Sequence, residues 1–153
     1  MSPMGAYMAW LRSRVGTALV LVPSVNAVVR DGDGRILLQR HREGGDWGLP
    51  GGAVEPEEDP ADALVREVRE ETSLEVALGR VIGAYGGPDA TLHYDNGDVT
   101  SHVRIAYEAT VVGGVLQADG VEVLEARFTT TAERAELTVP PIVARMLADA
   151  GVG

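Results

Sequence analysis

Residues 52–74, GAVEPEEDPADALVREVREETSL, form the stretch of sequence that decides the fold. Glu67, Glu70 and Glu71 stand at positions i, i+3 and i+4, so a helix projects all three carboxylates from one face. Like charges at this spacing repel one another and weaken a helix unless a cation lies against them. Closely set carboxylate oxygens are ligands that Mg²⁺ and Mn²⁺ prefer. The pattern therefore predicts a helix that carries a divalent-metal site.

Local signals predict where this helix begins and which side it buries. Asp59 is a good N-cap, Pro60 suits the first helical turn, and Asp62 favours the positive end of the helix. An apolar stripe, displaced around the helix from the carboxylates, is expected to pack on the core. It consists of Ala61, Leu64, Val65 and Val68.

The spacing of this segment resembles the Nudix box. In that motif a glycine is followed by five residues, Glu, seven residues, Arg-Glu, an aliphatic residue, any residue, Glu-Glu, any residue, Gly and an aliphatic residue. The segment Leu49-Pro50-Gly51-Gly52 precedes the box, as it often does in Nudix proteins, which favours this reading over a merely solvated acidic helix face. The matching positions are Gly52, Glu58, Arg66, Glu67, Val68, Glu70, Glu71 and Leu74.

Two positions depart from the family's pattern. Ser73 replaces the second glycine of the box, at the turn after the helix, where glycine supplies a left-handed cap at little cost. Glu57 stands where many members have a glycine just before the upstream Glu58. Neither change removes an expected metal ligand.

The resemblance implies an α/β/α sandwich with a mixed β-sheet. It also implies Mg²⁺- or Mn²⁺-dependent hydrolysis of a nucleoside diphosphate linked to another moiety. Glu67, Glu70 and Glu71 would hold the metal, together with the backbone carbonyl of Gly51. Glu58 would add a ligand through water or orient the helix.

The remaining catalytic roles are less sharply defined by the sequence. Arg66 is expected to pair with neighbouring carboxylates, including Glu70 at i+4, and to fix their rotamers rather than touch the substrate. In this family the general base lies within the box or on a distant loop. Glu67 is the first choice, because it stands next to the expected metal site. Candidates outside the box are Glu108, Glu122 and Glu125.

Substrate selection is expected to come from residues outside the box. Trp47, Tyr85 and Tyr94 offer aromatic rings for a base, although core packing is the commoner use of any one aromatic residue. His93 and His102 flank a turn and could contact phosphate or ribose. The sequence leaves the substrate open. Further weak candidates are the arginines Arg40, Arg42, Arg80 and Arg104, and the downstream Pro88.

The whole chain fits one domain, residues 1–153, with residues 1–16 as an N-terminal helical extension. A formal net charge of −10 disfavours long nucleic acid as a partner, while a small nucleotide stays compatible with bound metal. There is no Cys, which excludes disulfides and thiol catalysis. An apolar run at 16–22 is too short to span a membrane and is broken by Pro23, so a cytoplasmic protein is expected.

The other elements are expected in an order that suits a sheet between helices. The N-terminal helix at 6–15 either packs on its own domain through Tyr7, Trp10, Leu11 and Val15 or contributes to a homodimer. The segment 31–34, Asp-Gly-Asp-Gly, is expected to be a tight turn. Strands are expected at 17–22, 25–30, 35–40, within 75–85, at 100–112 and at 121–129, and a closing helix at 140–150.

Three functions remain open from the sequence. The first is a pyrophosphohydrolase that acts on a nucleoside diphosphate sugar, such as ADP-ribose, or on a nucleoside triphosphate. The second is a binding module of the same fold that senses a nucleotide without cleaving it. The intact acidic triplet favours the enzyme, because a pure binder has no need to retain that mutual repulsion. Removal of pyrophosphate from RNA 5′ ends is the third, and the net charge disfavours it.

Overall fold

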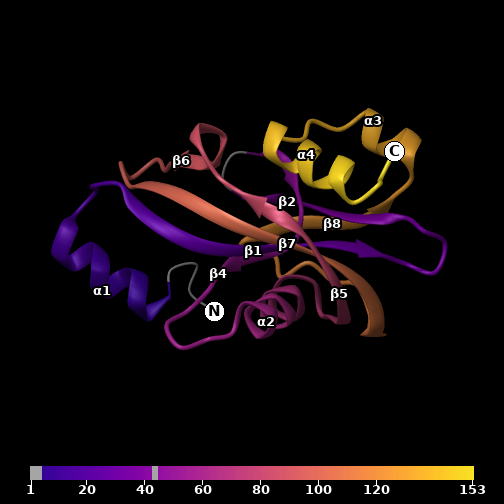
Figure 1. Ribbon diagram of the computed structural model, residues 1–153, viewed down its shortest axis with the longest axis horizontal. Coiled ribbons are helices and arrows are strands. Elements are labelled where there is room, and N and C mark those ends of the chain that lie inside the picture. The colour runs from indigo at the N-terminus through magenta and orange to yellow at the C-terminus, as the bar shows by residue number, and fades with distance from the viewer. Residues whose placement is uncertain (1–4, 43–44) are drawn as a thin grey trace.

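The computed structural model describes residues 5–42 and 45–153, which form a mixed β-sheet with helices on both sides (Figure 1). The hydrogen-bonded strand order is β3-β2-β1-β7-β5, and β4, β6 and β8 pair with β1, β7 and β2. The central strands β1 and β7 run parallel, whereas the other pairs are antiparallel. The strands are β1 (Val20–Arg30), β2 (Ile36–His41), β3 (Trp47–Gly48), β4 (Gly51–Ala53), β5 (Leu74–Tyr85), β6 (Thr91–His93), β7 (Val99–Gly114) and β8 (Val123–Thr129).

Two helices cover opposite faces of the sheet, which confirms the expected sandwich (Figure 1). Successive residues of a strand point to opposite faces, so neighbouring residues of β1 enter different cores. Val25 and Ala27 pack with helix α2, whereas Val28 packs with helix α4. The helices are α1 (Ala6–Val15), α2 (Pro60–Thr72), α3 (Thr131–Ala135) and α4 (Pro141–Asp149), with a 3₁₀ turn at Pro88–Ala90.

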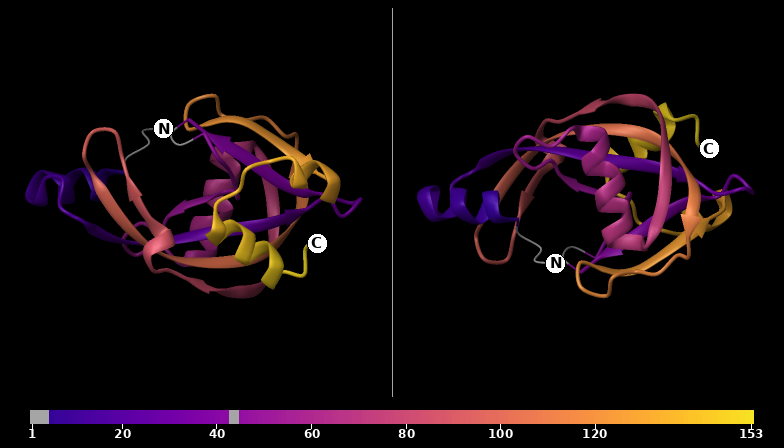
Figure 2. Two further views of the ribbon diagram at one scale, coloured as in Figure 1. Left: turned by 90° about the horizontal axis from the view of Figure 1, so that it is seen from above. Right: turned by 90° about the horizontal axis from the view of Figure 1, so that it is seen from below.

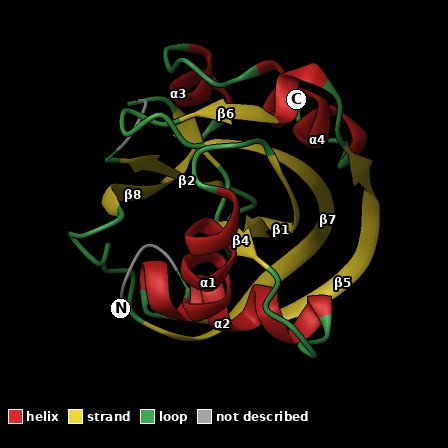
Figure 3. Cartoon of the chain, turned by 90° about the vertical axis from the view of Figure 1, so that its left-hand side faces the viewer, coloured by secondary structure: helices red, strands yellow, loops and turns green. Residues whose placement is uncertain are grey.

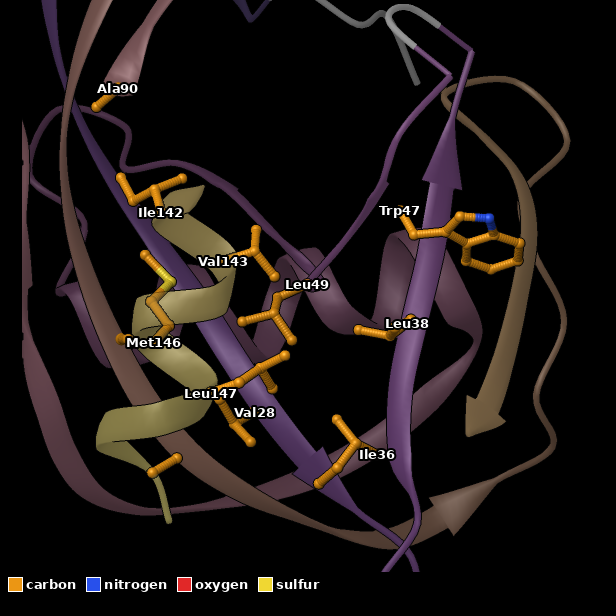
Figure 4. Packing of buried hydrophobic residues seen from close by; sticks show 12 residues of the cluster. Val28, Ile36, Leu38, Trp47, Leu49, Ala90, Ile142, Val143, Met146 and Leu147 are labelled. Carbon is orange, nitrogen blue, oxygen red and sulfur yellow. The ribbon is translucent and has the colours of Figure 1, made fainter. Parts of the chain in front are cut away.

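The closing helix α4 is held by its apolar side. Ile142, Val143, Met146 and Leu147 are buried, as the spacing of these residues predicts. Figure 4 shows them directed toward the sheet, where they meet a cluster that includes Leu49. Because Leu49 directly precedes the turn into β4, this core anchors one end of the segment that approaches α2.

Strand β1 differs from the expectation of two separate strands at 17–22 and 25–30. It is one continuous strand in which Pro23 pairs with Val103 of β7. Proline has no N–H to donate, but its carbonyl still accepts a hydrogen bond from the N–H of Val54 (2.9 Å). The ladder therefore continues through Pro23, and β1 pairs side by side with the whole of β4.

Helix α1 has the expected bounds, and its contact with its own domain is limited to a half-buried side that includes Leu11 and Arg12. None of its residues is buried, and Tyr7 and Trp10 are 46% and 52% exposed. Figure 2 shows the helix projecting from the body of the molecule. Its main attachment is Arg12, which donates to the carbonyl of Val99 (2.8 Å) and lies 3.5 Å from Asp98.

Candidate active site

Helix α2 begins where the sequence predicts. The Asp59 carboxylate accepts a hydrogen bond from the N–H of Ala61 (2.8 Å), and Pro60 occupies the first helical position. The buried side is shifted from the expected apolar stripe. Leu64 and Val68 are buried as expected, whereas Ala61 and Val65 are only half-buried. The buried side contains Glu67 and Glu71 instead, which are 7% and 2% exposed. Two of the three candidate metal ligands are therefore turned toward the sheet rather than toward open solvent.

Arg66 gathers the carboxylates that surround it. Its guanidinium donates two hydrogen bonds to Glu58, at 2.7 and 2.9 Å, one to Glu67 at 3.0 Å and one to Glu70 at 3.2 Å. It also donates to the carbonyl of Ala53 on β4 at 3.4 Å. The residue therefore neutralises part of the acidic cluster and ties the helix to the preceding loop, as its i, i+4 position relative to Glu70 predicts.

Glu71 is held from the sheet side. Its carboxylate accepts hydrogen bonds from the backbone N–H of Gly51 (2.9 Å) and from the Gln39 side chain (3.1 Å). The Nε2 atom of His41 lies 3.9 Å from the same carboxylate. Sequence reasoning missed Gln39 and His41, although a polar residue directly after the apolar run 36–38 was a usable signal.

Burial dominates the electrostatics of these two carboxylates. Burial raises the pKa of Glu67 to about 7, against the opposing effect of Arg66, and the charges of Glu70 and Glu122 raise it further. Burial also raises the pKa of Glu71 well above its usual value, and the charges of Glu67 and Glu122 add to that shift. Both carboxylates are thus costly to ionise together without an additional cation nearby.

The two glycines that precede the helix are required by close approaches. A Cβ atom on Gly52 would lie 2.5 Å from the Glu67 carboxyl carbon. A Cβ atom on Gly51 would overlap the backbone carbonyl oxygen of Val25 and lie 2.8 Å from the Asn26 amide nitrogen. Residue 52 therefore leaves room for a carboxylate of α2, and residue 51 leaves room for strand β1.

The donor set suits a hard divalent cation. Three carboxylates and a backbone carbonyl at Gly51 provide oxygen ligands only, as Mg²⁺ and Mn²⁺ prefer. Across residues 5–42 and 45–153, no three carboxylate or imidazole groups converge closely enough to surround one metal ion. Glu67 and Glu70 are instead bonded to Arg66, and Glu71 to Gly51 and Gln39.

The three acidic residues proposed as bases outside the box have different surroundings. Glu108 lies 3.5 Å from Arg80, and Glu125 lies 3.7 Å from Arg40, so each has a surface partner. Glu122, in the loop before β8, is close enough to the cluster for its charge to raise the pKa of carboxylates on α2. The structure brings only this one of the three toward the helix.

The candidate substrate ligands also separate. Trp47 is buried in the core, with the Arg127 guanidinium 5.0 Å from its ring centroid. Arg42 donates to the carbonyls of residues 120 and 121, at 2.9 and 2.7 Å. Tyr94 is half-buried in the turn between β6 and β7. Figure 3 shows β6 on the side of the molecule that carries α4, away from α2.

The two departures from the box coincide with unusual backbone. Within the described residues, Glu57 and Ser73 are the non-glycine residues with positive φ, at 65° and 63°. Ser73 is the left-handed C-cap of α2. Glycine adopts this conformation without the steric cost of a Cβ atom. We therefore expect Ser73→Gly to raise the free energy of unfolding by about 0.5–1 kcal/mol, and Glu57→Gly by a similar amount.

Urea denaturation followed by circular dichroism checks this expectation. Ser13→Gly is the matched control, because Ser13 is an exposed residue in the right-handed interior of α1, where glycine destabilises. Destabilisation by Ser73→Gly as large as that of the control would contradict the cost assigned to the left-handed cap.

Comparisons with known proteins agree with this arrangement. The family model described as NUDIX domain matches residues 20–150. An ADP-ribose pyrophosphatase of Methanocaldococcus jannaschii is 37% identical over 110 residues, which cover 67% of this chain and 60% of the relative. A MutT-like protein of Streptomyces ambofaciens is 38% identical over 79 residues, or 52% of this chain and 51% of the relative. The chain thus spans about half to three fifths of the length of these relatives.

Solved structures show the same fold. A MutT protein from Methanosarcina mazei superposes with a TM-score of 0.66 at 24% identity, covering 86% of this chain and 94% of that one. A MutT NUDIX hydrolase from Burkholderia pseudomallei gives a TM-score of 0.65 at 26% identity, covering 85% and 98%. No helix in the described residues is long and apolar enough to cross a membrane. With its family match spanning most of the chain, this protein belongs to the NUDIX domain family.

Proposed function

We propose that this protein hydrolyses the diphosphate linkage of a small nucleotide and depends on Mg²⁺ or Mn²⁺. The observation that carries the proposal is the burial of Glu67 and Glu71 beside one another with raised pKa values. A sensor that only binds a nucleotide gains nothing from two carboxylates that are so costly to ionise. Relatives named as an ADP-ribose pyrophosphatase and a putative 8-oxo-dGTP diphosphatase support the same reaction class.

In this proposal Glu67, Glu70 and Glu71 hold the cation, together with the carbonyl of Gly51. A bound divalent cation neutralises phosphoryl oxygens and lowers the pKa of water. Arg66 keeps the carboxylates in place through its hydrogen bonds.

Two residues are candidates for the base that takes a proton from the attacking water. Glu67 is the first, because burial brings its pKa to about 7, close to the operating range of a general base. Glu122 is the second, because burial raises its pKa and the charges of Asp119 and Glu70 raise it further. Glu67→Gln and Glu122→Gln, compared in kcat over pH 6–9, separate them: loss of the acidic limb identifies the base.

A panel of nucleotides tests the proposed function. ADP-ribose, UDP-glucose, dGTP and ATP are incubated with Mg²⁺ or Mn²⁺, and the products are separated by anion-exchange chromatography. We expect cleavage of the diphosphate linkage in at least one of them, abolished by EDTA. Saturable binding of these nucleotides without turnover would instead identify a sensor.

Metal binding is also expected to depend on pH. The pKa of Glu67 in the folded, metal-free protein lies above its usual value. Its contribution to the stability of the folded state is therefore fully present below about pH 4.5 and is lost as the pH rises through about 7. A cation removes that penalty, since it favours the ionised form. We expect Mg²⁺ to raise Tm by about 5 °C more at pH 8 than at pH 5.5, measured by differential scanning calorimetry. An equal shift at both values would contradict the assignment of Glu67 as a ligand.

We also propose a homodimer to which α1 contributes. The helix exposes Tyr7 and Trp10, and Leu19 and Leu21 follow it with similar exposure. Large exposed apolar patches commonly mark protein interfaces. Light scattering at micromolar concentration is expected to give a dimer mass, which falls to that of a monomer on deletion of residues 1–14. A monomer mass for the full-length chain would refute the proposal.

A further inference from the structure

Arg104 on β7 differs from the other arginines that are candidates for substrate binding. Its guanidinium is half-buried, and in the described part of the chain it takes part in no ion pair. The others already have partners. These are Glu125 for Arg40 (3.7 Å), Glu108 for Arg80 (3.5 Å) and the carbonyls of residues 120 and 121 for Arg42.

The hydrogen-bonding capacity of Arg104 is largely unused. One terminal nitrogen donates a long hydrogen bond to the Asn26 side-chain oxygen (3.4 Å), and the buried Nε atom has no partner among the described residues. Burial lowers the pKa of this guanidinium, which reflects the cost of keeping a charge in this position. Its charge in turn contributes to the lowered pKa values of His41 and His102, after the larger effect of burial.

Arg104 lies across β1 from the segment that contacts α2. In the ladder Ser24 pairs with both Arg104 and Ala53, and Asn26 pairs with Gly51. Paired residues in a sheet point to the same side, so Arg104, Ser24 and Ala53 form one row. On the other side of Arg104 the row continues to Tyr85 of β5. Positions 24 and 53 carry small side chains, so Arg104 and Tyr85 are the long side chains of this row.

A chain of hydrogen bonds links Arg104 to the acidic cluster. The Asn26 amide that accepts from Arg104 also donates to the carbonyls of Leu49 (3.4 Å) and Pro50 (3.5 Å). The next residue, Gly51, donates its N–H to Glu71. A cation and a carboxylate cluster therefore lie at two ends of one short polar path through β1 and the β4 segment.

We propose that Arg104 is a specificity-determining residue that binds a phosphate oxyanion of the diphosphate substrate. The inference rests on the proposed function, because Arg104 would bind the part of the diphosphate whose charge the proposed cation does not neutralise. A guanidinium presents Nε–H and Nη–H in a planar fork that matches two phosphate oxygens. The unpartnered Nε–H would gain an acceptor, and the partly desolvated charge would gain an anion. His102 adds no further donor, because its two ring nitrogens are already hydrogen-bonded to Ser24 Oγ (2.6 Å) and Thr100 Oγ1 (2.9 Å).

The test compares Arg104→Gln and Arg104→Lys with the matched control Arg80→Gln, which removes an arginine that already pairs with Glu108. Steady-state kinetics use the nucleotide from the panel that is cleaved fastest. Calorimetry with α,β-methylene-ADP and Mg²⁺ measures binding of a diphosphate that cannot be hydrolysed. Thermal unfolding of each variant establishes that it is folded, and Arg104→Lys keeps the positive charge if Arg104→Gln does not fold.

We expect Arg104→Gln to raise KM and the Kd of α,β-methylene-ADP by about 10- to 100-fold with kcat within about threefold of wild type. Arg104→Lys should fall between wild type and Arg104→Gln, and Arg80→Gln should match wild type. An unchanged Kd in folded Arg104→Gln, or a fall in kcat at constant KM and Kd, would overturn the subsite.

The two proposals fail separately in this design. If the wild type cleaves a nucleotide but the Kd does not depend on Arg104, the hydrolase proposal is supported and the Arg104 proposal is contradicted. If α,β-methylene-ADP binds in an Arg104-dependent way but no nucleotide is cleaved, the Arg104 proposal is supported and the hydrolase proposal is contradicted. No binding of α,β-methylene-ADP by the wild type overturns the subsite as well.

Discussion

Replacement of both Glu70 and Glu71 by Gln is expected to lower kcat by at least about a hundredfold while the protein stays folded. Each change removes a negative charge that is proposed to hold the cation, yet keeps the shape of the side chain. After Glu71→Gln the side-chain amide oxygen can still accept a hydrogen bond from the N–H of Gly51, so the contact between β4 and α2 is retained. Loss of like-charge repulsion on α2 should not weaken the helix.

Kinetic assays with Mg²⁺ and circular dichroism measure the two parts of this expectation. Asp62→Asn is a suitable control, because it removes an exposed carboxylate from the first turn of the same helix. Wild-type turnover by the folded double variant would rule out the proposed metal site on α2. The control is expected to retain kcat within about twofold, since Asp62 lies about two turns from Glu70 and Glu71.

Arg66→Ala is expected to lower kcat by about 30-fold or more, with little change in KM. The guanidinium holds Glu58, Glu67 and Glu70 in fixed positions but is not proposed to touch the substrate. Its loss leaves partly buried carboxylates without their cation, so the free energy of unfolding should also fall by about 1–3 kcal/mol. Urea denaturation measures that change.

Arg69→Ala on the same helix is the matched control. Arg69 pairs with Glu75 at an exposed position, and such pairs contribute little to stability. We expect kcat for this control to be unchanged. If Arg66→Ala instead raised KM at constant kcat, Arg66 would be a substrate ligand.

The start of α2 and the spacing of its carboxylates could be predicted from the sequence, because the residues that determine them are close together in the chain. The Asp59 cap, Pro60 and the i, i+3, i+4 carboxylates all refer to residues within a few positions of one another. The burial of Glu67 and Glu71 could not be predicted in this way. Helical spacing says that they share a face, but only the packing of α2 on the sheet determines that this face is enclosed.

The remaining differences also come from contacts between distant segments. Pro23 looked like a break between strands, but pairing with β7 on one side and β4 on the other keeps β1 continuous. The four candidate arginines looked alike in the sequence. Arg104 is distinguished by its surroundings in three dimensions, since its neighbour Asn26 belongs to a strand 78 positions earlier in the chain.

The close approaches at Gly51 and Gly52 have a consequence for how this protein tolerates sequence variation. Adjacent residues of an extended segment face opposite ways, so the absence of a side chain matters for folding at one glycine and for the active site at the other. A side chain at 51 would push against the backbone of β1 and oppose folding itself, whereas one at 52 would displace the Glu67 carboxylate and leave the framework intact. Variants at these neighbouring positions should therefore divide into an unstable class and a stable but inactive class.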